Sequence, residues 1–215
     1  MNRFFLKDDN RIDQINNRKI PRVWWSRPYE YKYIIDNLKP SDTVLDVGAG
    51  IEHPLKFYIA DNCKKCVALD VDANILNVKY DNLETINEDI LNYKTNEKYD
   101  KIVVVSVLEQ SKNHLIEKFE NMYNLLKDDG MILITSDYPS LDPLKVLGYA
   151  KVSKLIPTSE FQERISEESI YHALYQLNCY TITLKKETMP RKQKIETEYK
   201  KNIIEPKKRK TRKRG

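Results

Sequence analysis

A short apolar segment that ends in a glycine turn constrains this chain more than any other feature. Residues 43–50 read Thr-Val-Leu-Asp-Val-Gly-Ala-Gly, and the first five of them are typical of a buried parallel strand. Gly48 and Gly50 follow without a spacer, and a helical pattern comes next. Because glycine has no Cβ, such a turn lets the backbone approach a ligand closely. The segment therefore predicts a ligand cradle, with the carboxylate of Asp46 just before the turn.

Strand-like and helix-like segments alternate after this turn. The predicted strands are residues 66–70, 83–86, 99–106 and 131–135, and the predicted helices between them are residues 73–80 and 114–126. Strands separated by helices form parallel βαβ units, and ligands of such sheets lie beyond the carboxyl ends of the strands. We therefore expect an α/β protein with a Rossmann-like, doubly wound, mostly parallel sheet and helices on both faces.

The flanking regions differ in character from this central part. We expect an N-terminal arm over residues 1–28, an α/β domain over 29–187 and a basic, disordered tail over 188–215. Residues 190–215 hold twelve lysines or arginines against three glutamates, so the chain's net charge of +5 arises in the tail. Residues 166–177 are predicted to form a helix capped by Ser166.

Composition indicates the compartment. No apolar run approaches the ~20 residues that span a bilayer, so we expect no membrane association. The N-terminus becomes charged too early for a signal peptide, and three cysteines suit a reducing environment. We therefore expect a cytoplasmic protein.

Polar residues that follow the predicted strands suit S-adenosylmethionine. Asp70 ends the second strand about 20 residues after the glycine turn, where a carboxylate can accept both ribose hydroxyls. Asp89 follows the third strand and could accept from the adenine amino group, with Ile90 against the ring. Ser106 and Leu108 follow the fourth strand and would face the reactive end of the cofactor.

Four segments together resemble consecutive motifs of the class I S-adenosylmethionine-dependent methyltransferases. They are residues 44–50, 67–72, 99–109 and 125–134, and they occur in the order and at the spacings of that family. The resemblance covers roughly residues 40–137 and implies a methyltransferase that uses S-adenosylmethionine. The cofactor-binding residues that it implies are Asp46, Gly48, Ala49, Gly50, Asp70, Val71, Asp89, Ile90, Ser106 and Leu108.

The chain departs from this family's pattern in two places. Glu52 stands where a third glycine is usual, and its carboxylate could repel the cofactor's carboxylate or bind its ammonium group. The family's sheet ends in an antiparallel hairpin, but only Tyr180–Leu184 is a convincing strand, so a truncated or atypical final hairpin is expected. Residues 201–204 are a second candidate for the last strand. A dinucleotide-binding protein is the nearest alternative, but it needs glycine where His53 stands.

Methyl transfer is an in-line displacement, so it needs a base only if the acceptor must lose a proton. Glu109 and Tyr138 are the candidate catalytic residues, with Asp137 beside them at the same sheet edge. Glu109 could equally cap a helix, and Tyr138 could form part of the pocket wall. Cys63 and Cys66 have metal-ligand spacing but no second pair, so we expect no metal site.

Three functions follow from these observations. The first is a methyltransferase that acts on oxygen or nitrogen of a small or sugar-like molecule. The second is a nucleic-acid methyltransferase whose tail, from Lys207 to Arg214, contacts phosphates without reading sequence. The third is a binding or scaffold protein that keeps the fold without turnover, which Glu52 and the uncertain final strands suggest.

Overall fold

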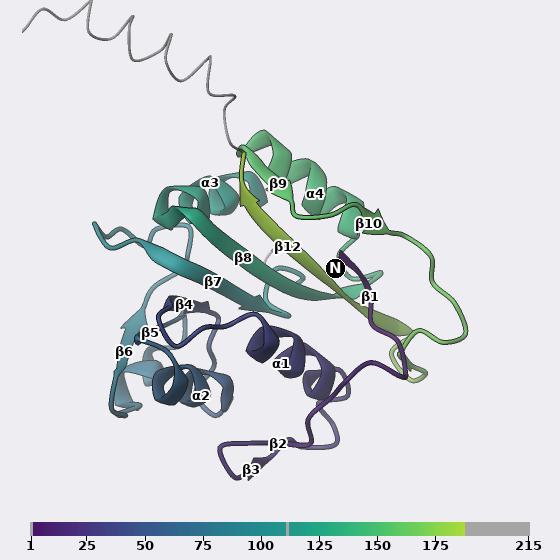
Figure 1. The fold of residues 1–215 in the computed structure, drawn as a ribbon, viewed down its shortest axis with the longest axis horizontal. Coiled ribbons are helices and arrows are strands. Elements are labelled where there is room, and N and C mark those ends of the chain that lie inside the picture. Colours follow the sequence, from purple (N-terminus) through teal and green to yellow (C-terminus); the bar gives the residue numbers. More distant parts are fainter. Residues whose placement is uncertain (1, 111, 188–215) are drawn as a thin grey trace, which may run out of the picture.

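A twisted sheet with helices on both faces forms the protein (Figure 1). The computed structural model describes residues 2–110 and 112–187. Across the sheet the strand order is β10-β1-β12-β8-β7-β4-β5-β6, and the strands from β8 to β6 are parallel to one another. These parallel strands are β4 (Thr43–Val47), β5 (Lys65–Asp70), β6 (Leu83–Asn87), β7 (Tyr99–Val105) and β8 (Leu126–Tyr138). The predicted Rossmann-like α/β fold is confirmed.

Four α-helices and one short 3-10 helix connect and cover the strands in the described part of the chain. The helices are α1 (Arg27–Asp36), α2 (Leu55–Asn62), the 3-10 helix Ala73–Asn77, α3 (Leu115–Leu125) and α4 (Pro143–Val152). Figure 1 shows α1 and α2 on one side of the sheet and α3 and α4 on the other. A small separate hairpin pairs β2 (Gln14–Ile15) with β3 (Arg18–Lys19).

Strand β4 is mostly apolar because its alternate residues are buried on opposite faces of the sheet. Val44 belongs to a buried cluster with Ile34 of α1 and Ile59 of α2. Its neighbour Leu45 belongs to the cluster on the opposite face, together with Phe119 of α3. Successive strand side chains point to opposite faces, so a strand covered on both sides is mostly apolar. Thr43 and Asp46 are the buried polar residues of β4.

The far side of the sheet is more complete than the sequence suggested. Strand β12 (Leu177–Lys186) runs antiparallel to β8, and β9 (Leu155–Pro157) pairs antiparallel with its end. The N-terminal strand β1 (Asn2–Phe4) then adds to the other half of β12 and carries β10 (Phe161–Gln162). The final hairpin is therefore atypical rather than truncated, because the chain's own N-terminus completes the edge. The alternative strand at residues 201–204 lies outside the described residues.

The predicted helix over residues 166–177 is wrong. This segment contains β11 (Tyr171–His172) and a turn that leads into β12. The Ile170 backbone N–H donates to the carbonyl of Phe5 at 2.9 Å, and Lys7 N–H donates to the carbonyl of Glu168 at 2.8 Å. Pairing with a segment more than 150 residues away in the sequence therefore outweighs the local helical pattern.

Residues 1–28 contribute more than an outer arm, since β1 is part of the sheet and α1 begins at Arg27. The division into an arm, a domain and a tail stays a prediction. The basic tail lies outside the described residues. No helix in the described part of the chain is long and apolar enough to cross a membrane.

Candidate functional site

The glycine turn after β4 is held against the end of β5. The backbone N–H groups of Gly48 and Ala49 both donate to the carbonyl of Leu69, at 2.8 and 3.1 Å. Gly48 has φ +67°, and a Cβ on it would lie 2.4 Å from a methyl carbon of Val107. Both the left-handed backbone and the close approach require glycine here. The turn therefore forms the expected cradle.

Asp70 closes this cradle from the neighbouring strand. One of its carboxylate oxygens accepts from the N–H of Gly50 at 2.7 Å, and the other accepts from the N–H of Asp72 at 2.9 Å. These bonds fix the carboxylate at the carboxyl edge of the sheet, beside the turn. A carboxylate with lone pairs to spare in that position can accept from hydroxyl groups of a ligand.

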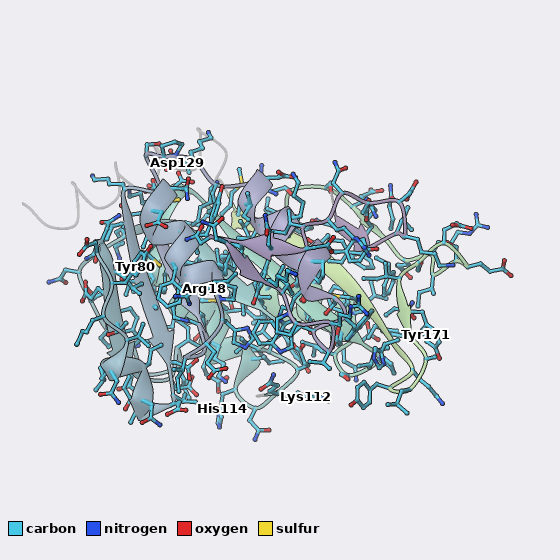
Figure 2. All side chains as sticks on the ribbon, turned by 90° about the horizontal axis from the view of Figure 1, so that it is seen from below. Arg18, Tyr80, Lys112, His114, Asp129 and Tyr171 are labelled. Carbon is cyan, nitrogen blue, oxygen red and sulfur yellow. The ribbon has the colours of Figure 1, made fainter. Side chains whose placement is uncertain are left out.

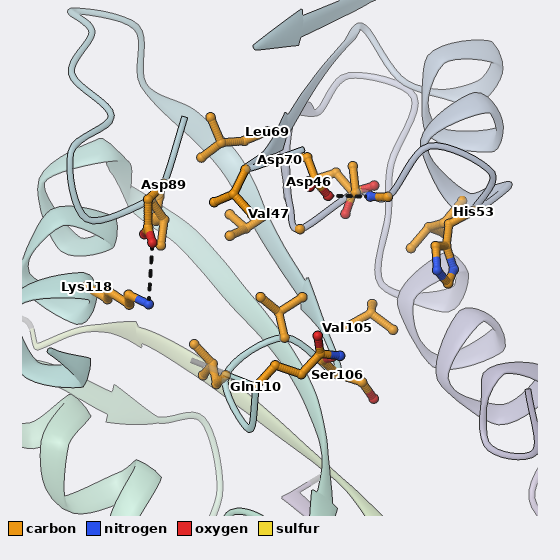
Figure 3. A pocket seen from close by; sticks show the side chains of 18 of the residues that line it. Asp46, Val47, His53, Leu69, Asp70, Asp89, Val105, Ser106, Gln110 and Lys118 are labelled. Carbon is orange, nitrogen blue, oxygen red and sulfur yellow. Dashed lines mark hydrogen bonds and ion pairs between the residues drawn. The ribbon is translucent and has the colours of Figure 1, made fainter. Parts of the chain in front are cut away.

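A cavity of about 420 Å³ opens at this edge of the sheet (Figure 3). All ten residues predicted to bind the cofactor line it, together with residues from α1, the loop before α2 and α3. The ten residues lie at or just after the carboxyl ends of β4, β5, β6 and β7. The parallel register brings these strand ends side by side. The site that the sequence predicted is thus one continuous cavity.

Asp89 and Ile90 mark one end of the cavity. Asp89 accepts from the N–H of Leu91 at 2.8 Å, and the ammonium of Lys118 lies 3.8 Å from its other oxygen. Ile90 is almost fully buried and belongs to the core. This end combines an apolar surface with an acceptor, which suits a flat, polar-edged ring.

Asp46 and Lys56 lie beneath the turn. Burial raises the pKa of Asp46 to about 7, although the nearby charge of Lys56 acts in the opposite direction. Burial likewise lowers the pKa of Lys56 to about 8. The Lys56 ammonium donates to the carbonyls of Gly50 at 2.7 Å and of His53 at 2.6 Å, so it holds the end of the turn in place.

A buried polar network on α1 was not predicted from the sequence. Glu30 is fully buried and accepts from Ser106 at 2.7 Å, from Thr135 at 2.6 Å and from Ser26 at 2.9 Å. It also pairs with Arg27, which lines the cavity and donates to Ser106 at 2.8 Å. Burial alone would raise the pKa of Glu30, but the charge of Arg27 and the hydroxyl donors hold it below its ordinary value.

A signal for this network was present in the sequence. Arg27 and Glu30 are three residues apart in a helix that begins with proline, and this spacing places opposite charges side by side. Their partners on β7 and β8 could not be identified without the fold. Tyr31 and His53 also line the cavity and were not among the predicted site residues.

The two candidate catalytic residues lie outside the cavity lining. Glu109 accepts from the hydroxyl of Ser136 at 2.7 Å, and burial raises its pKa. Tyr138 packs edge-on against Phe4, with ring centroids 5.7 Å apart. Asp137 lies between them in the sequence and has one buried oxygen without a hydrogen-bond partner in the described part of the chain. Burial and the nearby carboxylates of Glu30 and Glu109 raise its pKa to about 7.

The remaining candidates do not form a site. Cys63 and Cys66 are buried free thiols, and burial raises the pKa of both. No group of three or more histidine, cysteine, aspartate or glutamate residues with metal-binding geometry occurs among residues 2–110 and 112–187. Glu52 is exposed and is not part of the cavity lining.

Comparison with known proteins identifies the family. A family model described as a methyltransferase domain matches residues 17–184, which is most of the chain. The chain belongs to this family, and the resemblance to class I S-adenosylmethionine-dependent methyltransferases is confirmed. S-adenosylmethionine-dependent methyltransferases are among the solved structures that share its fold, and two of those structures contain S-adenosylhomocysteine.

Individual relatives are more distant. (S)-Coclaurine N-methyltransferase from Papaver somniferum is 28% identical over 109 residues, which cover 45% of this chain and 30% of that enzyme. NodS, an N-methyltransferase from Bradyrhizobium japonicum WM9 solved with S-adenosyl-L-homocysteine, has a TM-score of 0.58 at 16% identity, covering 75% of this chain and 88% of that chain.

A third relative is 1,6-didemethyltoxoflavin-N1-methyltransferase from Burkholderia thailandensis, with a TM-score of 0.59 at 14% identity, covering 77% of this chain and 81% of that chain. At such identities the two solved structures show a shared fold.

Proposed function

We propose that this protein transfers the methyl group of S-adenosylmethionine to a nitrogen or oxygen atom of a small molecule. The observation that carries the proposal is that all ten predicted cofactor contacts line one cavity beside a glycine cradle. When bound, the cofactor supplies an electrophilic methyl group on a sulfonium. The task of the protein is then to hold donor and acceptor in line.

The residues of the cavity divide this task. Asp89 and Ile90 would hold the adenine, and Asp70 would accept from the ribose hydroxyls. Arg27 would balance the carboxylate of the methionine part. It is a cavity-lining cation whose charge acts on His53, and His53 lies across the cavity from Asp89 (Figure 3). The turn at Gly48 has no Cβ and would leave room for the part of the cofactor that joins the ribose to the sulfur.

The acceptor would enter past the ends of β7 and β8. Glu109 is the proposed general base there, because its carboxylate is held by the Ser136 hydroxyl beside these strand ends and burial raises its pKa above the ordinary value. The packing of Tyr138 against Phe4 supports a role in the wall rather than in proton transfer. Two relatives are named as N-methyltransferases of coclaurine and of 1,6-didemethyltoxoflavin. These names support a small-molecule acceptor and favour nitrogen as the acceptor atom.

Nucleic acid is the second candidate acceptor, supported by the basic composition of residues 207–214. Methylation of RNA or DNA by the full chain should then fall steeply with salt and with deletion of residues 190–215. Equal activity of the deleted chain on a small amine would instead support the first proposal.

Calorimetry with S-adenosylmethionine tests the cofactor assignment. The full chain should bind, and Asp70→Ala should weaken binding by about 100-fold, because charge-assisted bonds to two hydroxyls are lost. Asp72→Ala removes a neighbouring, exposed acid and serves as the matched control. Absence of binding by a folded wild-type protein would refute the proposed function.

A further inference from the structure

His53 lies at the opposite end of the cavity from Asp89. Figure 3 shows the two residues on opposite sides of the cavity, with Asp46 and Asp70 between them. If adenine occupies the Asp89 end and ribose the middle, the methionine part of the cofactor extends toward His53. This placement rests on the proposed function.

The imidazole of His53 is held on several sides. Its ring stacks on Trp24 with centroids 4.4 Å apart and an interplanar angle of 16°. Its Nδ1 lies 2.9 Å from the hydroxyl oxygen of Tyr31. On the other side, a Cβ added to Gly50 would lie 2.3 Å from the ring. An ordinary surface histidine has no such restraints, so this ring is fixed relative to the cradle.

The charge state of His53 at neutral pH also follows from its surroundings. Burial lowers its pKa to about 4, and the cations of Arg27 and Lys56 act in the same direction. The carboxylates of Glu30 and Asp70 oppose this shift but do not overcome it. The imidazole is therefore neutral, and one ring nitrogen carries a hydrogen while the other is an acceptor.

Tyr31 decides which nitrogen carries the hydrogen. Its side chain is almost fully buried, and in the described part of the chain its hydroxyl has two partners, His53 and Arg27. Arginine can only donate, so the phenol hydrogen has one acceptor available, the Nδ1 of His53. Leaving that buried hydrogen unpaired would be costly. The hydrogen of the imidazole is therefore on Nε2, which makes no hydrogen bond to the described residues.

We propose that His53 is a cofactor-binding residue, which donates from Nε2 to the carboxylate of the methionine part, and that Tyr31 is the positioning residue that fixes its tautomer. The side chain thereby supplies a donor next to the place where the family's third backbone glycine is replaced by Glu52. Arg27 provides the charge, and His53 provides a directed neutral donor.

Calorimetry on the full chain with two probes tests the contact. S-adenosylhomocysteine carries the amino-acid carboxylate, and 5′-deoxy-5′-methylthioadenosine lacks it. His53→Phe keeps an aromatic ring for Trp24 but has no donor. It should weaken binding of S-adenosylhomocysteine about tenfold and leave binding of methylthioadenosine within about twofold. Equal losses for both probes, or a loss for neither, would overturn the proposal.

The tautomer has its own readout. Nitrogen NMR of the free wild-type protein at pH 7 should show a neutral His53 protonated at Nε2, and Tyr31→Phe should shift the ring toward a tautomer mixture. An Nδ1–H or charged ring in the wild type would overturn the proposal even if both probes bind. Failure of the wild type to bind either probe, with the Nε2–H tautomer present, would instead count against the proposed function and remove the basis for the carboxylate contact.

Discussion

The two halves of the sheet are built differently. In the cofactor half, β6, β5, β4 and β7 are parallel, and the residues that follow them line the cavity. In the closing half, β12 runs antiparallel to β8, β9 and β1. There, strand β1 pairs Arg3 with Thr181, from nearly the opposite end of the described chain. The cofactor half is built from strands that are joined by helices in βαβ units, whereas the closing half depends on pairing between segments far apart in the sequence.

Helix α1 joins these halves. Glu30 accepts hydrogen bonds from Ser106 after β7 and from Thr135 on β8, and Arg27 reaches the cavity from the same helix. Changes in the closing half, or at Glu30 of α1, are therefore expected to alter mainly stability. Changes in the cofactor half should alter mainly ligand binding.

The largest expected effect follows from removing the Glu30 carboxylate, which links the two halves of the sheet. Glu30→Ala leaves Arg27 as a buried, unpaired charge and should lower the free energy of unfolding by about 3–5 kcal/mol. Glu30→Gln keeps one acceptor oxygen, for the hydroxyls of Ser106 and Thr135, and should cost less. Urea denaturation at pH 7 measures the free energy of unfolding of both variants. A loss below about 1 kcal/mol for Glu30→Ala would show that the Glu30 network does not stabilise the contact between the halves.

The next effect isolates the closing half. Phe4 is buried against the rings of Tyr138, Phe161 and Tyr180, so Phe4→Ala should cost about 3 kcal/mol of stability. Affinity for S-adenosylhomocysteine should stay within about twofold where the variant is folded. Val23→Ala, at a site that is 81% exposed, is the control. If the folded variant loses more than about twofold in affinity, the closing half also contributes to ligand binding, and the proposed separation of roles is wrong.

A pH-dependent effect comes from Asp137. Its pKa is raised to about 7 in the folded protein, so the folded state keeps a proton that the unfolded state releases at lower pH. Stability should therefore fall as the pH rises from about 4 to 7. The full shift corresponds to about 4 kcal/mol, and solvent screening of this half-buried group reduces that effect to about 2 kcal/mol. Asp137→Asn should remove that part of the fall and be more stable than wild type at pH 8, but not at pH 4. Asp129 is exposed at the surface of the molecule (Figure 2), so Asp129→Asn should leave the profile unchanged. A profile unaffected by Asp137→Asn would contradict the assignment.

The smallest effect concerns the departure from the family's glycine pattern. Because Glu52 is exposed and outside the cavity lining, Glu52→Gly should change cofactor affinity by less than about twofold. Calorimetry beside Asp70→Ala as the sensitive control decides this. A change above about tenfold would place the Glu52 carboxylate at the cofactor after all.

Sequence reasoning worked best where the pattern is local. The run from Thr43 to Val47 and the glycines after it predicted the strand, the turn and the cavity, because burial on both faces and a left-handed backbone each demand particular residues. It failed at residues 166–177, where turn residues and pairing with Phe5 outweigh helical spacing. Strand β1 was not predicted, because three residues are too few to show a recognisable strand pattern.

The sequence by itself determined the parallel half of the sheet, the glycine cradle and the acids at the strand ends, because these follow from short-range periodicity and backbone sterics. Only the tertiary structure decided how the sheet is completed, what Glu30 binds and how His53 is held between Trp24, Tyr31 and Gly50. Those contacts join segments far apart in the chain, and their energies come from burial and from complete hydrogen bonding. No local pattern encodes either of these.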